Sequence, residues 1–140
     1  MKVFVYGTLK PGEENYQRYC AGQVVNATKA VAQGKLFALP MGYPAMTQGD
    51  SPIHGYLLSF IDSRVLTDLD NLEDYYPDRS VSENLYNREQ IVTRDSQGHS
   101  LGWAWVYIMT EELALQLGGI HLPDGWWSAT ENYNNMNYRL

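Results

Sequence analysis

A chain of 140 residues is long enough to bury one hydrophobic core, and we expect residues 1–140 to form a single domain. Hydrophobic residues make up 44% of the chain and charged residues 19%, which is typical of a globular protein and argues against a disordered one. The formal net charge of −6 and the scattered positions of the 10 Lys and Arg residues argue against a nucleic-acid partner, because that binding depends on clustered basic side chains.

The first residues predict a strand, a loop and a short helix. Lys2 to Tyr6 is apolar on both alternating faces, which indicates an interior strand. Glycine and proline residues predict a loop over 7–14. A short helix is expected over 15–21, because Glu13 and Glu14 lie where negative charge favours a helix start.

The next segment is rich in valine, alanine and threonine. Residues 24–39 predict either two strands or one long bent strand with a bulge at Gly34. The dense glycine and proline residues of 40–44 predict a loop. A further strand is expected over 53–60.

The second half predicts two helices around a hairpin. Residues 62–72 have helical periodicity and are expected to begin with an Asp or a Ser cap. Two strands, 85–94 and 100–109, flank the turn Asp95-Ser96-Gln97-Gly98, and a short helix is expected from Thr110 to the glycines at 118–119. Strands dominate and their links are local, which predicts an α+β protein on a mostly antiparallel sheet that can curl into a barrel.

Three absences in the sequence bear on location. No apolar stretch reaches the roughly 18 residues of a membrane span, and the N-terminus lacks the apolar segment and cleavage site of a signal peptide. The single cysteine, Cys20, excludes an intrachain disulfide and suits a reducing compartment. We therefore expect a cytoplasmic protein with no membrane partner.

One carboxylate interrupts the apolar face of the predicted 62–72 helix. At about 100° per residue, Glu73 projects into the arc formed by the helix's apolar residues. These are Val65, Leu66, Leu69 and Leu72. Partial burial and the helix end would both raise the pKa of Glu73 and fit it for proton transfer near pH 7. The alternative is that the helix has ended and Glu73 forms an ion pair with Arg88 or Arg79.

The turn Tyr6-Gly7-Thr8-Leu9 lies where the first strand ends. Gly7 can adopt a positive φ and allows close approach to the backbone, and successive N–H groups there can converge on an anion. Such a concavity suits a carboxylate or a developing oxyanion. An ordinary strand-ending turn would have the same sequence, so the signal is weak on its own.

Five ordered motifs between residues 3 and 109 resemble those of the γ-glutamylcyclotransferase-like family, which includes the avirulence-induced plant proteins and the γ-glutamylamine cyclotransferases. The motifs are Val5-Tyr6-Gly7-Thr8-Leu9-Lys10-Pro11-Gly12, Gly42-Tyr43-Pro44, Leu69-Asp70-Asn71-Leu72-Glu73-Asp74-Tyr75, Tyr86-Asn87-Arg88 and Ala104-Trp105-Val106-Tyr107. The resemblance implies a mixed, mostly antiparallel sheet curled into a small barrel with a few flanking helices.

The resemblance also implies a set of site residues. Glu73 would be the catalytic residue, and Tyr86 would contact substrate. The residues that bind the γ-glutamyl group would be Tyr6, Gly7, Thr8 and Leu9. Asp74 departs from the family pattern, in which many members have Gly, and it brings a second negative charge beside Glu73.

The implied reaction cyclises a γ-glutamyl amine or γ-glutamyl amino acid to 5-oxoproline and releases the amine, with no cofactor. The dispersed residues His54, His99 and His121 predict no metal site. One alternative is a binding protein that keeps the fold and pocket without turnover. Another is an interaction protein that uses its tryptophans as anchors; these are Trp103, Trp105, Trp126 and Trp127.

Overall fold

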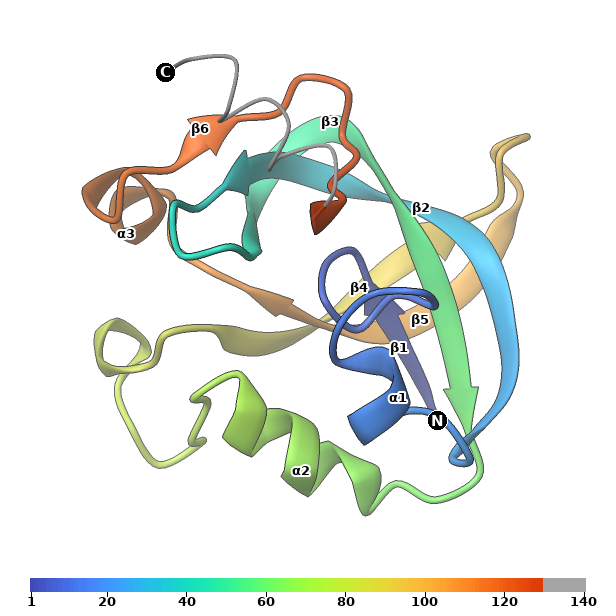
Figure 1. Cartoon of the computed structure of the whole chain (residues 1–140). Helices are drawn as coiled ribbons and strands as arrows, with labels where there is room; N and C mark the ends of the chain where they lie inside the picture. The colour runs from blue at the N-terminus through green and yellow to red at the C-terminus, as the bar shows by residue number, and fades with distance from the viewer. Residues whose placement is uncertain (130–140) are drawn as a thin grey trace.

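The strands of this α+β protein close into a mixed barrel (Figure 1). The computed structural model describes residues 1–129. Around the barrel the strands follow the order β3, β1, β5, β4 and β2, and β2 pairs back with β3 to close it, while β6 adds to β2. The strands are β1 (Lys2–Val5), β2 (Val24–Ala38), β3 (Pro44–Phe60), β4 (Asn87–Arg94), β5 (Ser100–Ile108) and β6 (Ile120–His121).

Only the β1–β5 pair is parallel among these strands, and the other pairs are antiparallel. This arrangement confirms the expected fold class. The long hairpin of β2 and β3 supplies most of the wall, and its register shifts between Gly34 and Lys35. The segment 24–39 therefore forms one long strand with a register shift at Gly34, as in the second of the two alternatives, but the extra residues at that shift, 48–50, belong to β3.

The start of β3 differs from the sequence prediction. Pro44 was assigned to a loop and the strand was expected only from Ile53, but β3 begins at Pro44. Residues Pro44 to Thr47 pair with Ala38 to Lys35 of β2, and Ala45 and Met46 are buried. Proline is accepted at the first residue of a strand, where its missing N–H removes no essential ladder bond.

The helices are short and lie outside the barrel. α2 (Val65–Leu72) starts later than predicted and lacks the expected Asp or Ser side-chain cap: its N-cap is Arg64, whose N–H donates to the Asp62 carboxylate at 2.8 Å in the turn before the helix. α1 (Tyr16–Tyr19) is shorter than the expected helix. The chain adds a 3₁₀ turn, η1 (Val81–Glu83), that the sequence did not predict.

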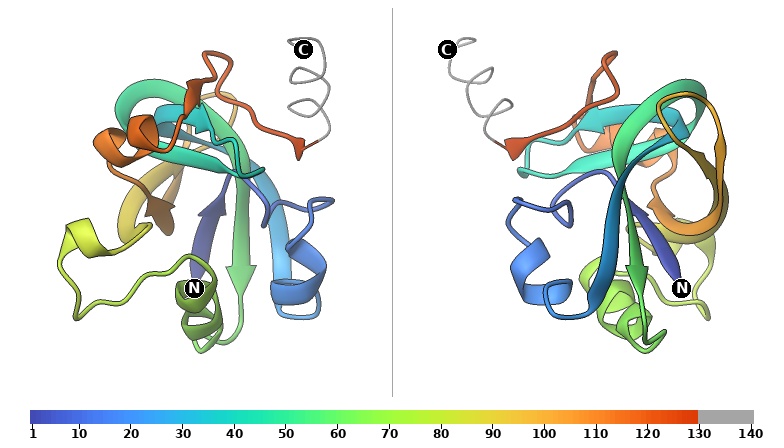
Figure 2. Two further views of the ribbon diagram at one scale, coloured as in Figure 1. Left: turned by 60° about the vertical axis from the view of Figure 1, so that its left-hand side comes forward. Right: turned by 90° about the vertical axis from the view of Figure 1, so that its right-hand side faces the viewer.

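The predicted cap of α3 (Glu111–Gln116) is confirmed, because the hydroxyl of Thr110 accepts a hydrogen bond from the N–H of Leu113 at 3.2 Å. α3 and β6 lie at the opposite end of the barrel from α2 (Figures 1 and 2). Within residues 1–129, no helix is long and apolar enough to cross a membrane.

Alternating side chains of the strands build two cores. One fills the barrel and includes Phe4 and Tyr6 of β1 and its continuation. The other lies between the outer wall and α2, where Val3 and Val5 belong to the same cluster as Leu69. Burying apolar surface contributes about 25 cal/mol per Å², so this second core fixes α2, and the residue that follows it, against the end of β1.

Candidate active site

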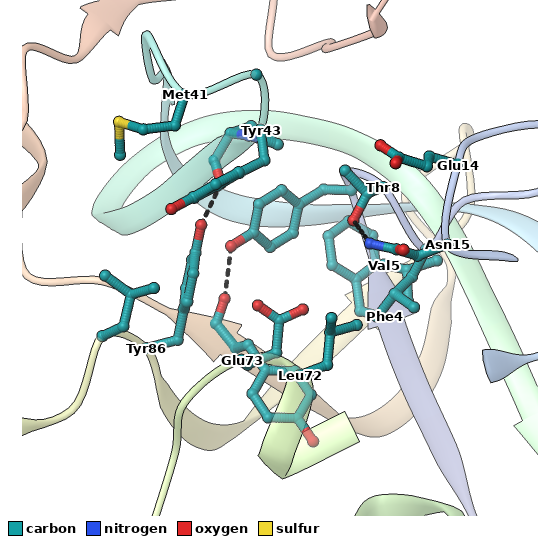
Figure 3. Close-up of a pocket in the computed structure, with 17 residues that line it drawn as sticks. Phe4, Val5, Thr8, Glu14, Asn15, Met41, Tyr43, Leu72, Glu73 and Tyr86 are labelled. Carbon is teal, nitrogen blue, oxygen red and sulfur yellow. Dashed lines mark hydrogen bonds between the residues drawn. The ribbon is translucent and has the colours of Figure 1, made fainter. Parts of the chain in front are cut away.

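A cavity of about 230 Å³ opens where β1 ends (Figure 3). Its walls are the turn after β1, the 41–43 loop with the first residue of β3, the end of α2 and the residues at the start of the β4–β5 hairpin. All six residues proposed for the site from the sequence line this cavity. They are Tyr6, Gly7, Thr8, Leu9, Glu73 and Tyr86.

The turn after β1 is held at both ends. The N–H of Lys10 donates to the carbonyl of Gly7 at 3.0 Å, which closes a tight turn. Asn15 contacts Thr8 twice, through its backbone N–H to the Thr8 carbonyl and through its amide to the Thr8 hydroxyl, each at 2.9 Å. Within the described residues, the N–H groups of Gly7, Thr8 and Leu9 donate no hydrogen bond. They therefore remain able to bind a ligand anion.

Of the two reasons expected for glycine at position 7, the structure supports close approach to the backbone and not a positive φ. Gly7 is not among the residues with positive φ. A Cβ atom there would lie 2.7 Å from Cγ of Pro44, well inside van der Waals contact. Gly7 thus lets the first motif pack directly against the Gly42-Tyr43-Pro44 motif, and these two segments form one wall of the cavity.

Glu73 follows directly after α2, and its N–H donates to the carbonyl of Leu69 at 3.0 Å. Its carboxylate points into the cavity (Figure 3). Burial raises the pKa of the Glu73 carboxyl from 4.5 to about 7. The group is therefore partly protonated at neutral pH.

The alternative ion pairs of Glu73 are not formed. Arg88 instead lies 3.0 Å from the Asp70 carboxylate, and Arg79 lies 3.1 Å from that of Asp74. Among residues 1–129, no basic side chain lies within ion-pair distance of Glu73. This absence agrees with a raised pKa, because a nearby cation would lower it.

Asp74 occupies a position that favours glycine. Its φ of 54° lies in the left-handed region, where it is the one non-glycine residue with positive φ among those described. Asp tolerates this conformation better than most residues, which accounts for both the Asp here and the Gly of the family pattern. Its carboxylate pairs with Arg79, and the raised pKa of Glu73 is due to burial instead.

Buried tyrosines join the walls of the cavity. The hydroxyl of Tyr6 donates to the carbonyl of Tyr107 at 2.6 Å and accepts the N–H of Met46 at 3.1 Å. Tyr86 donates to the carbonyl of Pro44 at 2.6 Å (Figure 3). Burial raises the pKa of both phenols well above 10, so neither is a base near neutral pH.

Sequence reasoning missed the contact that holds α2 in place. Asp70 accepts a hydrogen bond from the hydroxyl of Tyr107 at 2.7 Å and pairs with Arg88. Asp70 lies one helical turn before Glu73, so this contact fixes the end of α2 against β4 and β5. The available signal was that Asp70, Arg88 and Tyr107 each lie in one of the resembling motifs, but this gives no pairing by itself.

Other candidate groups contribute no rival chemistry. Burial raises the pKa of the Cys20 thiol to about 11, which makes it a poor nucleophile. Within residues 1–129, no group of three His, Cys, Asp or Glu side chains could hold a metal ion. Of the four tryptophans, Trp103 is 65% exposed whereas Trp127 is 2% exposed, so they do not form one anchoring surface.

The family profile for γ-glutamyl cyclotransferases of the AIG2-like type matches residues 3–129, and the chain belongs to that family. A relative from Niallia circulans, named gamma-L-glutamyl-butirosin B gamma-glutamyl cyclotransferase, is 31% identical over 105 residues. The match covers 75% of this chain and 65% of the relative, so the chain spans less than two thirds of that protein's length.

A second relative, from Vibrio cholerae, carries γ-glutamylcyclotransferase as a provisional name. It is 32% identical over 109 residues, which cover 78% of this chain and 82% of the relative. The crystal structure of an AIG2-like protein from Mus musculus superposes with a TM-score of 0.65 at 22% identity, and covers 91% of this chain and 87% of the mouse chain. That likeness supports the fold.

The raised pKa of Glu73 makes a prediction about stability. The folded protein binds this proton more tightly than the unfolded chain, so its contribution to stability is full below pH 4.5 and is lost as the pH rises through about 7. Glutamine does not ionise, so the Glu73→Gln variant does not lose this stability as the pH rises. The free energy of unfolding of the variant, relative to the unmodified protein, should rise by about 2–3 kcal/mol between pH 4.5 and 7.5.

Urea unfolding across this pH range measures the difference. The matched control is Glu112→Gln, which neutralises an exposed glutamate on α3 and should give a difference that does not change with pH. If the free energies of unfolding of Glu73→Gln and the unmodified protein changed with pH in parallel, the carboxyl of Glu73 would have the same pKa in the folded and unfolded states.

Proposed function

We propose that this chain is a γ-glutamyl cyclotransferase that converts a γ-glutamyl amine or γ-glutamyl amino acid to 5-oxoproline and the free amine. The observation that carries the proposal is the carboxylate of Glu73, which faces the cavity with a pKa of about 7 and has no cationic partner among the described residues. A carboxylate of this kind can both accept and return a proton at neutral pH.

The proposed reaction needs one proton acceptor and one anion-binding group. Glu73 takes a proton from the substrate's α-ammonium, and the resulting amine attacks the γ-carbonyl carbon of the same molecule. A tetrahedral oxyanion forms and then collapses, breaking the bond to the leaving nitrogen. Glu73 returns its proton to that nitrogen, and the ring nitrogen loses its second proton to the released amine through solvent, so the products are 5-oxoproline with a neutral ring amide and an ammonium, and no net proton is consumed. Because both reacting groups belong to one molecule, the cavity acts mainly by holding the folded conformer.

The turn after β1 would hold the negative charge. The N–H groups of Gly7, Thr8 and Leu9 line the same cavity as Glu73, and they would bind the substrate's α-carboxylate or the developing oxyanion. Tyr6 and Tyr86, whose hydroxyls are hydrogen-bonded to backbone groups, would give this pocket rigid walls.

A binding protein with the same pocket is the alternative function. A pure binder gains nothing from an unpaired, enclosed carboxylate, since isolated buried charge is costly. The distinction is experimental: purified protein is incubated with a panel of γ-glutamyl amines and γ-glutamyl amino acids, and 5-oxoproline is measured. Binding without 5-oxoproline production for every compound would support the alternative.

The variant Glu73→Gln tests the assignment of the proton acceptor. Turnover should fall roughly a hundredfold or more while 5-oxoproline still binds, because glutamine keeps the shape but cannot take a proton. In the unmodified protein, kcat/KM should rise with pH through a limb near the pKa of about 7. Steady-state kinetics on the folded variant, with Glu112→Gln as the control, would contradict the assignment if turnover stayed near normal.

The charges at the cavity indicate which leaving groups suit it. Glu73 and Glu14 line the cavity, and within residues 1–129 no Lys, Arg or His does so. The N–H groups of the turn can serve one anion, so a second carboxylate on the leaving amine would meet no cation and would share the cavity with Glu14 and Glu73. We therefore propose that γ-glutamyl amines are better substrates than γ-glutamyl amino acids.

Three substrates of matched size test this preference: the γ-glutamyl amides of 1,3-diaminopropane, propylamine and β-alanine. We expect kcat/KM to fall in that order, with steps of about fivefold, the effect of roughly 1 kcal/mol between exposed charges. Glu14→Gln should reduce the differences in kcat/KM among the three substrates, whereas Glu112→Gln should leave them unchanged. The fastest turnover for the β-alanine compound would contradict the proposal.

A further inference from the structure

Lys10 ends the candidate substrate-binding turn and is a buried cation. Its side chain is 1% exposed, although lysine is rarely buried unless its ammonium is paired. Its backbone belongs to the turn on both sides: the N–H donates to the Gly7 carbonyl at 3.0 Å, and the carbonyl accepts the N–H of Glu13 at 2.9 Å. Contacts that fix the Lys10 ammonium therefore also fix the position of the turn.

The partners of this ammonium come from the other end of the sequence. Lys10 Nζ donates a hydrogen bond to the carbonyl of Trp127. The same atom lies 3.6 Å from the centroid of the Trp126 ring, a distance typical of a cation–π contact. The C-terminal segment, residues 122–129, thus holds the lysine that closes the turn.

The C-terminal segment is itself fixed to the barrel. The N–H of Leu122 donates to Leu36 of β2 at 2.8 Å, and the carbonyl of Gly125 accepts the N–H of His54 of β3 at 2.7 Å. The Trp127 side chain is 2% exposed and belongs to the core inside the barrel. The segment is therefore a firm support for the turn.

We propose that Lys10 is a positioning residue, whose ammonium clamps the Gly7–Leu9 turn to the Trp126-Trp127 pair and so holds the turn's N–H groups in place for the substrate. The turn needs such a support, because these N–H groups donate no hydrogen bond to the described residues. Asn15, through its contacts with Thr8, holds the turn from one side and Lys10 holds it from the other. That a substrate binds at these N–H groups rests on the proposed function, whereas the contact between Lys10 and the tryptophan pair does not.

Trp126 offers the cleanest test, because it is only half-buried and its loss should leave the barrel folded. Trp126→Leu removes the ring under the ammonium and should lower kcat/KM for a γ-glutamyl amine about tenfold. Trp126→Phe keeps an aromatic face, so its kcat/KM should fall by less than about threefold. Trp103→Leu, a change of the exposed tryptophan on β5, is the matched control and should leave kcat/KM unchanged.

In Trp126→Leu, kcat/KM should be lower but should rise with pH around the same midpoint as in the unmodified protein, because the clamp does not contact the Glu73 carboxyl. Lys10→Met should also lower kcat/KM. The double variant Lys10→Met with Trp126→Leu should lose no more than Lys10→Met alone, since the contact that Trp126→Leu removes is already absent without the ammonium. A folded Trp126→Leu protein with kcat/KM within twofold of normal, or additive losses, would overturn the proposal.

Amide hydrogen exchange tests the clamp without substrate. In Trp126→Leu the N–H groups of Lys10 and Glu13 should exchange about tenfold faster, while that of Met109, bound to Met46 in the barrel at 2.9 Å, should not change. Equal effects at all three amides, or none, would overturn the clamp. If the unmodified protein turned over no γ-glutamyl compound, the proposed function would fail and the exchange rates alone would decide the clamp.

Discussion

The site depends on one unfavourable arrangement, a carboxylate enclosed in a cavity without a cation to balance it. The two arginines that the sequence suggested as partners of Glu73 are engaged elsewhere, Arg88 with Asp70 and Arg79 with Asp74. Burial therefore acts on Glu73 without compensation and raises its pKa to about 7. Asp70 and Asp74 are thus paired with arginines and have structural roles, whereas Glu73 is left unpaired among the described residues and can react.

The surrounding fold keeps this arrangement in place. Asp70 binds Tyr107 and Arg88, which ties α2 to β4 and β5, and the apolar face of α2 packs against β1. Tyr6, which directly follows β1, donates in turn to the carbonyl of Tyr107. The anion-binding turn and the carboxylate are therefore held against the same strands, and the cavity between them has a defined width. A barrel suits this role because its strands leave little freedom at their ends.

The helical periodicity of 62–72 was enough to predict that Glu73 is buried, and the glycine at position 34 was enough to mark the register shift between β2 and β3, since both signals are local. Long-range contacts were not predictable in this way. β6 is only two residues long and forms because it meets β2, and nothing local in Lys10 indicates that Trp127 lies beside it. The sequence indicated that Gly7 allows a close approach to its backbone, but it could not show that the approaching group is Pro44 from a distant segment, and a positive φ was wrongly expected.

The most direct test of the account is a titration of the Glu73 carboxyl itself. Carbon-13 NMR of the glutamate side-chain carboxyls, followed from pH 4 to pH 9, reports each protonation, and the Glu73→Gln spectrum identifies the signal that belongs to Glu73. The account predicts a midpoint near pH 7, because burial is uncompensated by any cation among residues 1–129. A midpoint near the ordinary value of 4.5 would show that the carboxylate is solvated or paired, and would contradict its role as the proton acceptor.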